Sequence, residues 1–171
     1  MGKEWKIFSG DEFSIDLQTG MSPVWVKKGS KPKCPSHNWG GKVKIIGALN
    51  NKTGKVMTLA CRKVNQFTFL DFLKKLLRYH KRVFLVVDNA SWHKTKMIDN
   101  YLKEHSKRIQ MEFFPTYCPE KNPVEQCWRA VKNDLLTCRL FLSVPSMEDH
   151  VKDYFKNRYF LNLKLERFLC P

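Results

Sequence analysis

Three acidic residues, Asp11, Asp88 and Glu125, stand where their carboxylates could converge. Asp88 directly follows the apolar run VFLVV at residues 83–87, which is typical of a buried strand. Asp11 follows the strand-like WKIF at residues 5–8, and Glu125 follows a proline-punctuated turn at the start of an expected helix. Clustered like charges repel each other unless a cation lies among them. The spacing therefore predicts a metal site built from acids on three elements.

The ligand chemistry of such a site favours a hard cation. The three acids offer only oxygen, and no convincing histidine or thiolate set accompanies them, so Mg²⁺ or Mn²⁺ is the expected ion. Two such ions, about 3.5 to 4 Å apart, would stabilise both the attacking and the leaving oxygen of an in-line phosphodiester displacement. One ion would activate water or a 3′-hydroxyl, and the other would take up charge on the leaving 3′ oxygen.

Each acid also has a purely structural interpretation. Asp88 could cap a turn or a helix. Glu125 could pair with Arg129 at i+4, a surface interaction worth roughly 0.3 to 0.5 kcal/mol. Glu12 or Asp16 could take the place of the first acid. The spacing alone does not separate these interpretations from the catalytic one.

The elements that must position the acids follow from the hydrophobic periodicity. The segment 42–49 alternates basic and apolar residues, and the segment 55–62 resumes an extended pattern after the turn signal NNKTG. Together they predict a β-hairpin. Further strands are expected at 83–87 and 109–114, and helices at 65–80, 95–105, 123–137 and from 146 onward. Asn65 is the expected N-cap of the first helix, and Ser146, with Asp149 three residues on, that of the last. This order predicts one mixed sheet with antiparallel first strands, parallel later strands and helices on both faces.

Length and charge indicate one domain with a polyanionic partner. The 171 residues suit a single domain, and 31 basic against 16 acidic residues give a net charge of +15. Nucleic acid is the simplest such partner, and a generally solvated basic surface is the alternative. The segment 20–33 is expected to be an insertion or short hairpin with a basic tip, whose Trp could instead be packed and its lysines solvated. The candidate DNA contacts are Trp25, Lys27, Lys28, Lys31, Lys94, Lys121 and Arg129.

The six cysteines indicate a reducing compartment. They form neither a C-x-x-C pair nor a compact disulfide framework, and no signal peptide or long apolar span is found, so an intracellular protein without a membrane segment is expected. A zinc site from Cys118, Cys127 and a histidine is not favoured, because the spacing fits no common ligand pattern.

Four segments together resemble a known family. GDEFSID (10–16), VWVKKGSKP (24–32), VVDNASWH (86–93) and FFPTYCPEKNPVEQCW (113–128) are similar to the catalytic domain of DDE-type transposases, in the bacterial and archaeal insertion-sequence branch of the mariner-like superfamily. The block D-N-A-x-x-H followed by Y-x-P-x-x-N-P-[IV]-E is specific as a pair. The resemblance covers residues 5–135 and leaves 140–171 as a C-terminal helical extension.

The resemblance implies an RNase H-like fold and a Mg²⁺-dependent triad. It also implies cleavage at transposon ends and transfer of the 3′-OH into target DNA, by a homodimer in a prokaryotic cytoplasm, associated with the nucleoid. The family's three acids fall on Asp11, Asp88 and Glu125. The residues that match motif positions shaping the site are Asn89, His93, Asn122 and Pro123. We assign His93 no proton transfer: at a helix start it contacts a phosphate or packs.

The chain also departs from the family pattern. Cys118 stands where the family usually has Ser or Ala, and Lys121 where it has a hydrophobic residue. The first catalytic strand begins almost at Met1, without the family's N-terminal helix-turn-helix domains, so a separately encoded helix-turn-helix portion, a truncated form or a remnant is expected. Two other functions stay open: an RNase H-like nuclease or resolvase without strand transfer, and a decayed, non-catalytic DNA-binding protein.

Overall fold

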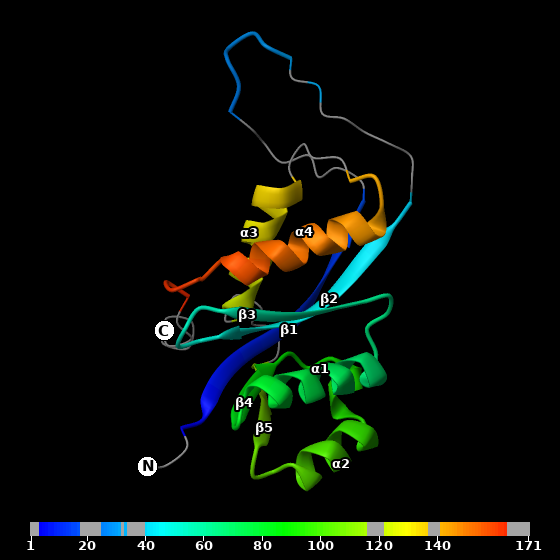
Figure 1. Cartoon of the computed structure of the whole chain (residues 1–171), viewed down its shortest axis with the longest axis vertical. Helices are drawn as coiled ribbons and strands as arrows, with labels where there is room; N and C mark the ends of the chain where they lie inside the picture. Colours follow the sequence, from blue (N-terminus) through cyan, green and yellow to red (C-terminus); the bar gives the residue numbers. More distant parts are fainter. Residues whose placement is uncertain are drawn as a thin grey trace.

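A five-stranded mixed sheet with the order β3-β2-β1-β4-β5 forms the centre of the protein (Figure 1). The computed structural model describes residues 4–17, 25–31, 33, 40–115, 122–136 and 141–163. The first three strands pair antiparallel, and β4 and β5 continue the sheet in parallel with β1. The strands are β1 (Lys6–Asp16), β2 (Lys42–Asn50), β3 (Val56–Cys61), β4 (Val83–Val87) and β5 (Ile109–Phe113). The predicted hairpin, mixed sheet and parallel strands are confirmed.

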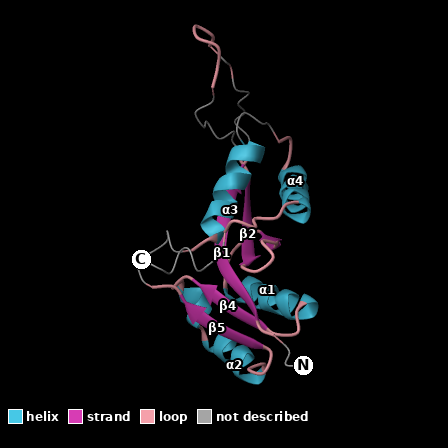
Figure 2. Cartoon of the chain, turned by 90° about the vertical axis from the view of Figure 1, so that its left-hand side faces the viewer, coloured by secondary structure: helices cyan, strands magenta, loops and turns pink. Residues whose placement is uncertain are grey.

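Helices cover both faces of this sheet and bury two apolar clusters. One cluster packs α3 and α4 against Phe13 and Ile15 of β1. The other packs α1 and α2 against Phe8 of β1 and Leu85 of β4. The helical elements are α1 (Gln66–Tyr79), η1 (Ser91–Lys94), α2 (Lys96–Glu104), α3 (Val124–Val131), the π-helical turn η3 (Lys132–Leu136) and α4 (Val144–Asn157). In both views β1 runs between the two pairs of helices (Figure 1, Figure 2).

The strand β1 is longer than the sequence indicated. We predicted that Asp11 follows the first strand, which is wrong: Asp11 lies inside β1, paired with Gly47 of β2. Gly10 and Asp11 are residue types that favour turns, but the alternation of Phe13, Ile15 and Leu17 continues the strand pattern beyond them. The pairing of β1 with β4 reaches Ser9, whereas its pairing with β2 continues to Asp16. Beyond Ser9, β1 is therefore paired with β2 on one side but not with β4 on the other.

The helix starts are set by capping side chains. Asn65 caps α1 as predicted: its Oδ1 accepts hydrogen bonds from the N–H groups of Phe67 (3.0 Å) and Thr68 (3.1 Å). The prediction that Ser146 starts the last helix is wrong, because Ser143 is the N-cap of α4 and its Oγ accepts from the Ser146 N–H at 3.3 Å. Pro145 fits the first turn of α4, where a missing N–H costs no hydrogen bond.

Residues 25–31, between β1 and β2, lie beyond α3 and α4 (Figure 1, Figure 2). They form a turn in which the Ser30 N–H donates to the Lys27 carbonyl at 2.9 Å, and Gly29 supplies a positive φ of 83°. Trp25 is fully exposed, at 104%, so it is not the packed Trp of the alternative interpretation. Within the described residues, no helix is both long and apolar enough to cross a membrane.

Candidate active site

A cleft of about 310 Å³ lies alongside the part of β1 that continues past its pairing with β4. Two of the predicted acids, Asp11 and Glu125, line it together with Glu12. Basic side chains of Lys44 and Lys132 also line the cleft, although the sequence analysis did not select them. The remaining lining residues are Phe13, Ser14, Val64, Trp92 and Trp128. Acids and lysines thus share one concave site.

Asp11 is held in place by an indole that lies on the sheet. The Nε1–H of Trp128 donates to Asp11 Oδ2 at 2.9 Å, and the Trp128 ring stacks on Phe13 with a centroid distance of 4.2 Å. Gly47, the β2 partner of Asp11, makes room for this ring: a Cβ at Gly47 would lie 2.4 Å from Trp128 Cη2. A glycine on one strand therefore allows a helix side chain to reach an acid on the next.

The electrostatics of Asp11 indicate crowded carboxylates. The pKa of Asp11 is raised from 3.8 to about 7, mainly by burial. The charges of Glu125 and Glu12 contribute to the rise, and hydrogen bonds from the Glu12 N–H and Trp128 oppose it. Such a carboxyl is only partly ionised near neutral pH, and a cation beside it would favour the ionised form. The oxygen-only donors of Asp11 and Glu125 fit Mg²⁺ or Mn²⁺.

Glu125 is positioned by the turn that starts α3. Buried Asn122 donates from Nδ2 to the carbonyl of Gly10 at 3.1 Å, and its Oδ1 accepts from the Val124 N–H at 3.2 Å. Pro123 precedes α3 with a helical φ of −63°. Asn122 thus ties the start of α3 to β1, one residue before Asp11. The exposed Glu125 stands in the first turn of that helix.

Asp88 lies at the end of β4, on the strand next to Asp11. The β1–β4 pairing ends at Ser9 opposite Val86, and each acid comes two residues after the last paired residue of its own segment. Asp88 is not among the described residues that line the cleft. Its Oδ1 accepts from the Ala90 N–H at 3.1 Å, so Asp88 does cap the turn after β4, as the structural interpretation predicted.

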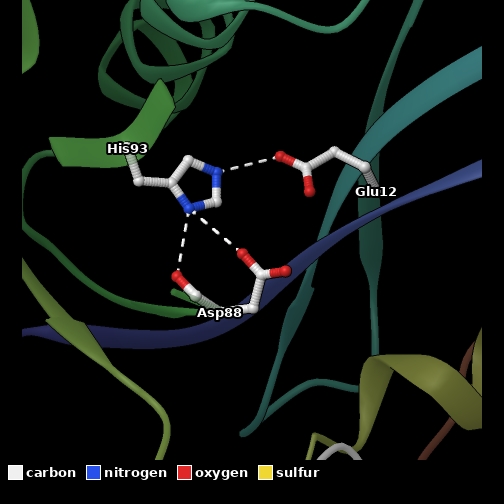
Figure 3. Close-up of side chains that lie close together, drawn as sticks. All are labelled: Glu12, Asp88 and His93. Atoms are coloured by element: carbon white, nitrogen blue, oxygen red, sulfur yellow. Dashed lines mark hydrogen bonds and ion pairs between the residues drawn. The ribbon is translucent and has the colours of Figure 1, made fainter. Parts of the chain in front are cut away.

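Buried His93 connects Asp88 to Glu12 (Figure 3). Its Nδ1 lies 3.1 Å from the Asp88 carbonyl oxygen and 3.3 Å from Asp88 Oδ1, and its Nε2 lies 2.9 Å from Glu12 Oε1. Burial acts to lower the pKa of His93, but the hydrogen bonds with Asp88 and Glu12 outweigh it and raise the pKa from 6.5 to about 9. The hydrogen bond with His93 lowers the pKa of Asp88. Of our two alternatives for His93, packing agrees with its complete burial.

Glu12 is the acid whose environment the sequence analysis missed. It was considered only as a substitute for Asp11, but the two residues point to opposite faces of β1: Asp11 meets Trp128 of α3, whereas Glu12 accepts from Trp92 Nε1 at 3.2 Å and contacts His93. The signal was present in the sequence, because adjacent residues of a strand face opposite sides.

The other selected residues have separate positions. Asn89 Nδ2 donates to the Phe114 carbonyl at 2.9 Å, and Lys94 Nζ donates to Asn89 Oδ1 at 2.7 Å. Arg129 is exposed on α3 and forms no ion pair with Glu125 among the described residues. Lys121, like Cys118 of the disfavoured zinc site, lies outside the described residues. Trp25, Lys27, Lys28 and Lys31 are all exposed on the insertion, and Cys127 is buried in α3.

Comparison with known proteins identifies relatives in both sequence and structure. Residues 6–148 match the family described as "DDE superfamily endonuclease". The "Insertion element IS630 uncharacterized 39 kDa protein" of Shigella sonnei is 29% identical over 135 residues, which cover 77% of this chain and 39% of that protein. The "Uncharacterized protein y4pE/y4sA" of Sinorhizobium fredii is 33% identical over 112 residues, covering 62% of this chain and 77% of that protein.

Solved structures of the Mos1 transposase share the fold. The mariner Mos1 paired end complex with Mg superimposes with a TM-score of 0.71 at 18% identity, covering 95% of this chain and 52% of that chain. The catalytic domain of Mos1 mariner transposase gives a TM-score of 0.62 at 18% identity, covering 95% and 78%. This likeness confirms the predicted RNase H-like fold. Because the family match covers most of the sequence, the chain belongs to the DDE superfamily endonucleases.

Proposed function

We propose that this chain is the catalytic domain of a DNA transposase, which cleaves DNA at transposon ends and transfers the 3′-OH into target DNA. The observation that carries the proposal is the meeting of Asp11 and Glu125 in a cleft that also presents Lys44 and Lys132. Asp88 comes directly after β4, the strand next to β1. The chain spans 39% of the IS630 protein and about half of the chain in the Mos1 paired end complex, so the activity of a whole transposase is part of this proposal.

In this proposal the acids of the site bind metal ions and the lysines bind the phosphate group. Asp11, Asp88 and Glu125 would hold two Mg²⁺ or Mn²⁺ ions, which when bound supply activation of the attacking oxygen and charge neutralisation at the leaving oxygen. Lys44 and Lys132 would hold the phosphate group in the cleft by charge. Asn122 and Trp128 orient Glu125 and Asp11 before DNA arrives, so little reorganisation is needed at the reacting phosphate.

The oligomer and the ions are supported by the structural relatives. Solved Mos1 complexes pair transposon ends and include forms with Mg and with Mn. We extend these features to this chain as a homodimer acting on paired DNA ends with either ion.

The Asp88→Asn variant tests the proposed function. It should abolish Mn²⁺-dependent cleavage of DNA carrying the element's terminal repeats, because a metal ligand is lost, while DNA binding stays equal or becomes tighter as one negative charge is removed. Cleavage and joining are measured on sequencing gels and binding by fluorescence anisotropy. Asp99→Asn, an exposed acid on α2, is the matched control and should cleave like the wild type.

The reaction products distinguish a transposase from the two alternative functions. A 3′ end joined to target DNA is expected of a transposase, whereas a nuclease or resolvase releases cut ends without joining. Equal loss of cleavage and binding in Asp88→Asn would contradict the metal-site assignment. Absence of metal-dependent cleavage in the wild-type chain, on DNA with cognate ends and supplied with a helix-turn-helix portion, would favour the non-catalytic remnant.

A further inference from the structure

The contacts of His93 show an imidazole ring enclosed between two acids from different strands (Figure 3). Nδ1 faces the Asp88 carbonyl oxygen and Oδ1, and Nε2 faces Glu12 Oε1. A backbone carbonyl only accepts hydrogen bonds, and so does an ionised carboxylate. Nδ1 therefore donates to the Asp88 carbonyl, and Nε2 shares a hydrogen bond with Glu12 Oε1. His93 thus links Glu12 to Asp88 through its two ring nitrogens.

The surroundings of His93 leave the ring little freedom to move. His93 is 0% exposed, and its ring packs on Phe69 of α1 with a centroid distance of 4.2 Å. Glu12 is itself held by the neighbouring Trp92, whose Nε1–H donates to the same Oε1 at 3.2 Å. Glu12 of β1 thus contacts the ring at Nε2, and Asp88, which follows β4, contacts it at Nδ1.

The consequence for Asp88 is that its two carboxylate oxygens differ. Oδ1 receives the Ala90 N–H at 3.1 Å and lies 3.3 Å from His93 Nδ1. Figure 3 shows the second oxygen directed away from the ring. We propose that Glu12 is a positioning residue, which acts through His93 to present Asp88 Oδ2 as a one-oxygen ligand to the catalytic cation. This inference rests on the proposed function, and it separates Glu12 from the metal-binding acids.

A competing arrangement is that Glu12, Asp88 and His93 themselves bind a metal ion. Their potential ligand atoms lie within 4.8 Å of one another. However, Nδ1 faces the Asp88 carbonyl, which only accepts hydrogen bonds, so Nδ1 donates its hydrogen and has no lone pair to offer a metal. A metal at this place would have to break the 2.9 Å contact between His93 and Glu12. The observed contacts favour positioning over ligation.

Two substitutions of Glu12 distinguish these roles. Glu12→Gln keeps an oxygen that can accept from His93 Nε2 and Trp92 Nε1, so it should retain much of the cleavage rate and Mn²⁺ affinity that Glu12→Ala loses. Glu12→Ala removes the acceptor and should lower kcat or Mn²⁺ affinity by about 10- to 100-fold, the usual effect of losing a partner that orients a ligand. KM for DNA should change little. If Glu12 were a metal ligand, Glu12→Gln would lose Mn²⁺ affinity as severely as Asp88→Asn.

Readouts other than cleavage keep this inference separate from the proposed function. Mn²⁺ binding is measured by electron paramagnetic resonance, and ¹⁵N NMR of labelled histidine should show a proton on His93 Nδ1 in the wild type and in Glu12→Gln. An unprotonated His93 Nδ1 in the wild type, or wild-type Mn²⁺ affinity and cleavage in a folded Glu12→Ala, would overturn the inference. If the wild-type chain cuts no DNA, the proposed function fails while the NMR and Mn²⁺ measurements still decide the role of Glu12.

Discussion

Asp11 and Glu12 are neighbours in the chain but have opposite electrostatic partners. Asp11 receives one neutral N–H from Trp128 and lies close to the charge of Glu125, whereas Glu12 is paired with the buried His93. Burial therefore makes the charge of Asp11 costly, while that of Glu12 is compensated inside the protein. A cation is needed at the first acid and is already supplied by the protein at the second.

Replacing Asp11 by Asn should change how stability depends on pH. In the metal-free wild type, Asp11 has a pKa near 3.8 when unfolded and about 7 when folded, so the folded state holds the proton more tightly. The free energy of unfolding should fall as pH rises from about 4 to about 7, by up to roughly 4 kcal/mol, and Asp11→Asn should lack this fall. Urea unfolding at successive pH values measures the difference.

Two comparisons make this result specific to Asp11. Asp71→Asn, at an exposed position of α1, should keep the wild-type pH dependence. Saturating Mg²⁺ should remove most of the wild-type fall, because the cation stabilises the ionised carboxylate. Parallel pH curves for the wild type and Asp11→Asn without metal would show that the proton on Asp11 does not govern stability.

At the scale of single residues, the sequence indicated the acids better than their partners. Asp88 and Glu125 were recognisable because an apolar strand and a proline-rich turn precede them. Trp128 and His93 could not be assigned to Asp11 and Glu12, because their contacts join residues 117 and 81 positions apart. Only the sheet register and the packing of α3 bring such residues together.

At the scale of elements, the packing of α3 against the sheet depends on Gly47. Any side chain there would meet the Trp128 ring, with Cη2 at 2.4 Å and Cζ2 at 3.1 Å from the added Cβ. The ring cannot simply move away, since it also stacks on Phe13 and donates to Asp11. The position of the helix and the orientation of the acid are therefore linked.

Gly47→Ala should destabilise the protein and weaken cleavage together. The added methyl group should cost about 1 to 3 kcal/mol in the free energy of unfolding, as overpacking in a core commonly does. Displacement of the indole should also reduce the cleavage rate by removing the hydrogen bond to Asp11. Urea unfolding and cleavage assays on the same samples measure both effects.

The chain provides a matched control for this substitution. Gly40→Ala adds the same methyl group where, apart from the adjacent residues of the chain, no atom of the described residues lies within 4 Å, and should leave stability within about 0.5 kcal/mol of the wild type. The double variant Gly47→Ala, Trp128→Phe should lose less free energy of unfolding than the sum of the two single losses, because the smaller ring leaves room for the added methyl group. Strict additivity would show that the added methyl group acts elsewhere.

Elements with strong local signals were predicted more accurately than those set by distant contacts. The helix α1 and the strand β4 have a capping asparagine and an unbroken apolar run, and both were found at the expected residues. The extent of β1 was underestimated because pairing with β2 carries it through Gly10 and Asp11. The start of α4 was misplaced because two serines compete as caps, and Pro145 favours the earlier one.

At the scale of the whole molecule, the charge of +15 is expected to dominate DNA binding. Each phosphate neutralised by Lys or Arg releases counterions, so log K should fall with log salt by about 0.9 per contact. The 171-residue chain should therefore bind duplexes of unrelated sequence with similar affinity and a steep salt dependence. Anisotropy titrations between 50 and 200 mM salt, roughly the range over which such binding weakens strongly, measure the slope.

The projecting insertion can be tested separately from the general charge. Replacing Lys27, Lys28 and Lys31 by Gln should reduce the salt slope by about 2 to 3 if these exposed lysines contact DNA.

The matched control removes three exposed lysines at the other end of the molecule, on and just after α2: Lys96, Lys103 and Lys107 (Figure 1). Equal losses in the two triple variants would support the alternative of a diffuse, solvated basic surface. A loss confined to the insertion variant would identify the insertion as the contact.

The alternation along β1 also affects which mutations the protein can tolerate. Asp11 faces α3 and Glu12 faces His93 because they occupy successive positions of one strand. Substitution of either acid alters one side of the site and leaves the other side's partners in place. An insertion or deletion of a single residue in β1 before Asp11 would turn each acid toward the other's partner, so that both halves of the site fail at once. Over evolutionary time, this segment should accept exchanges of residue type far more readily than changes of length.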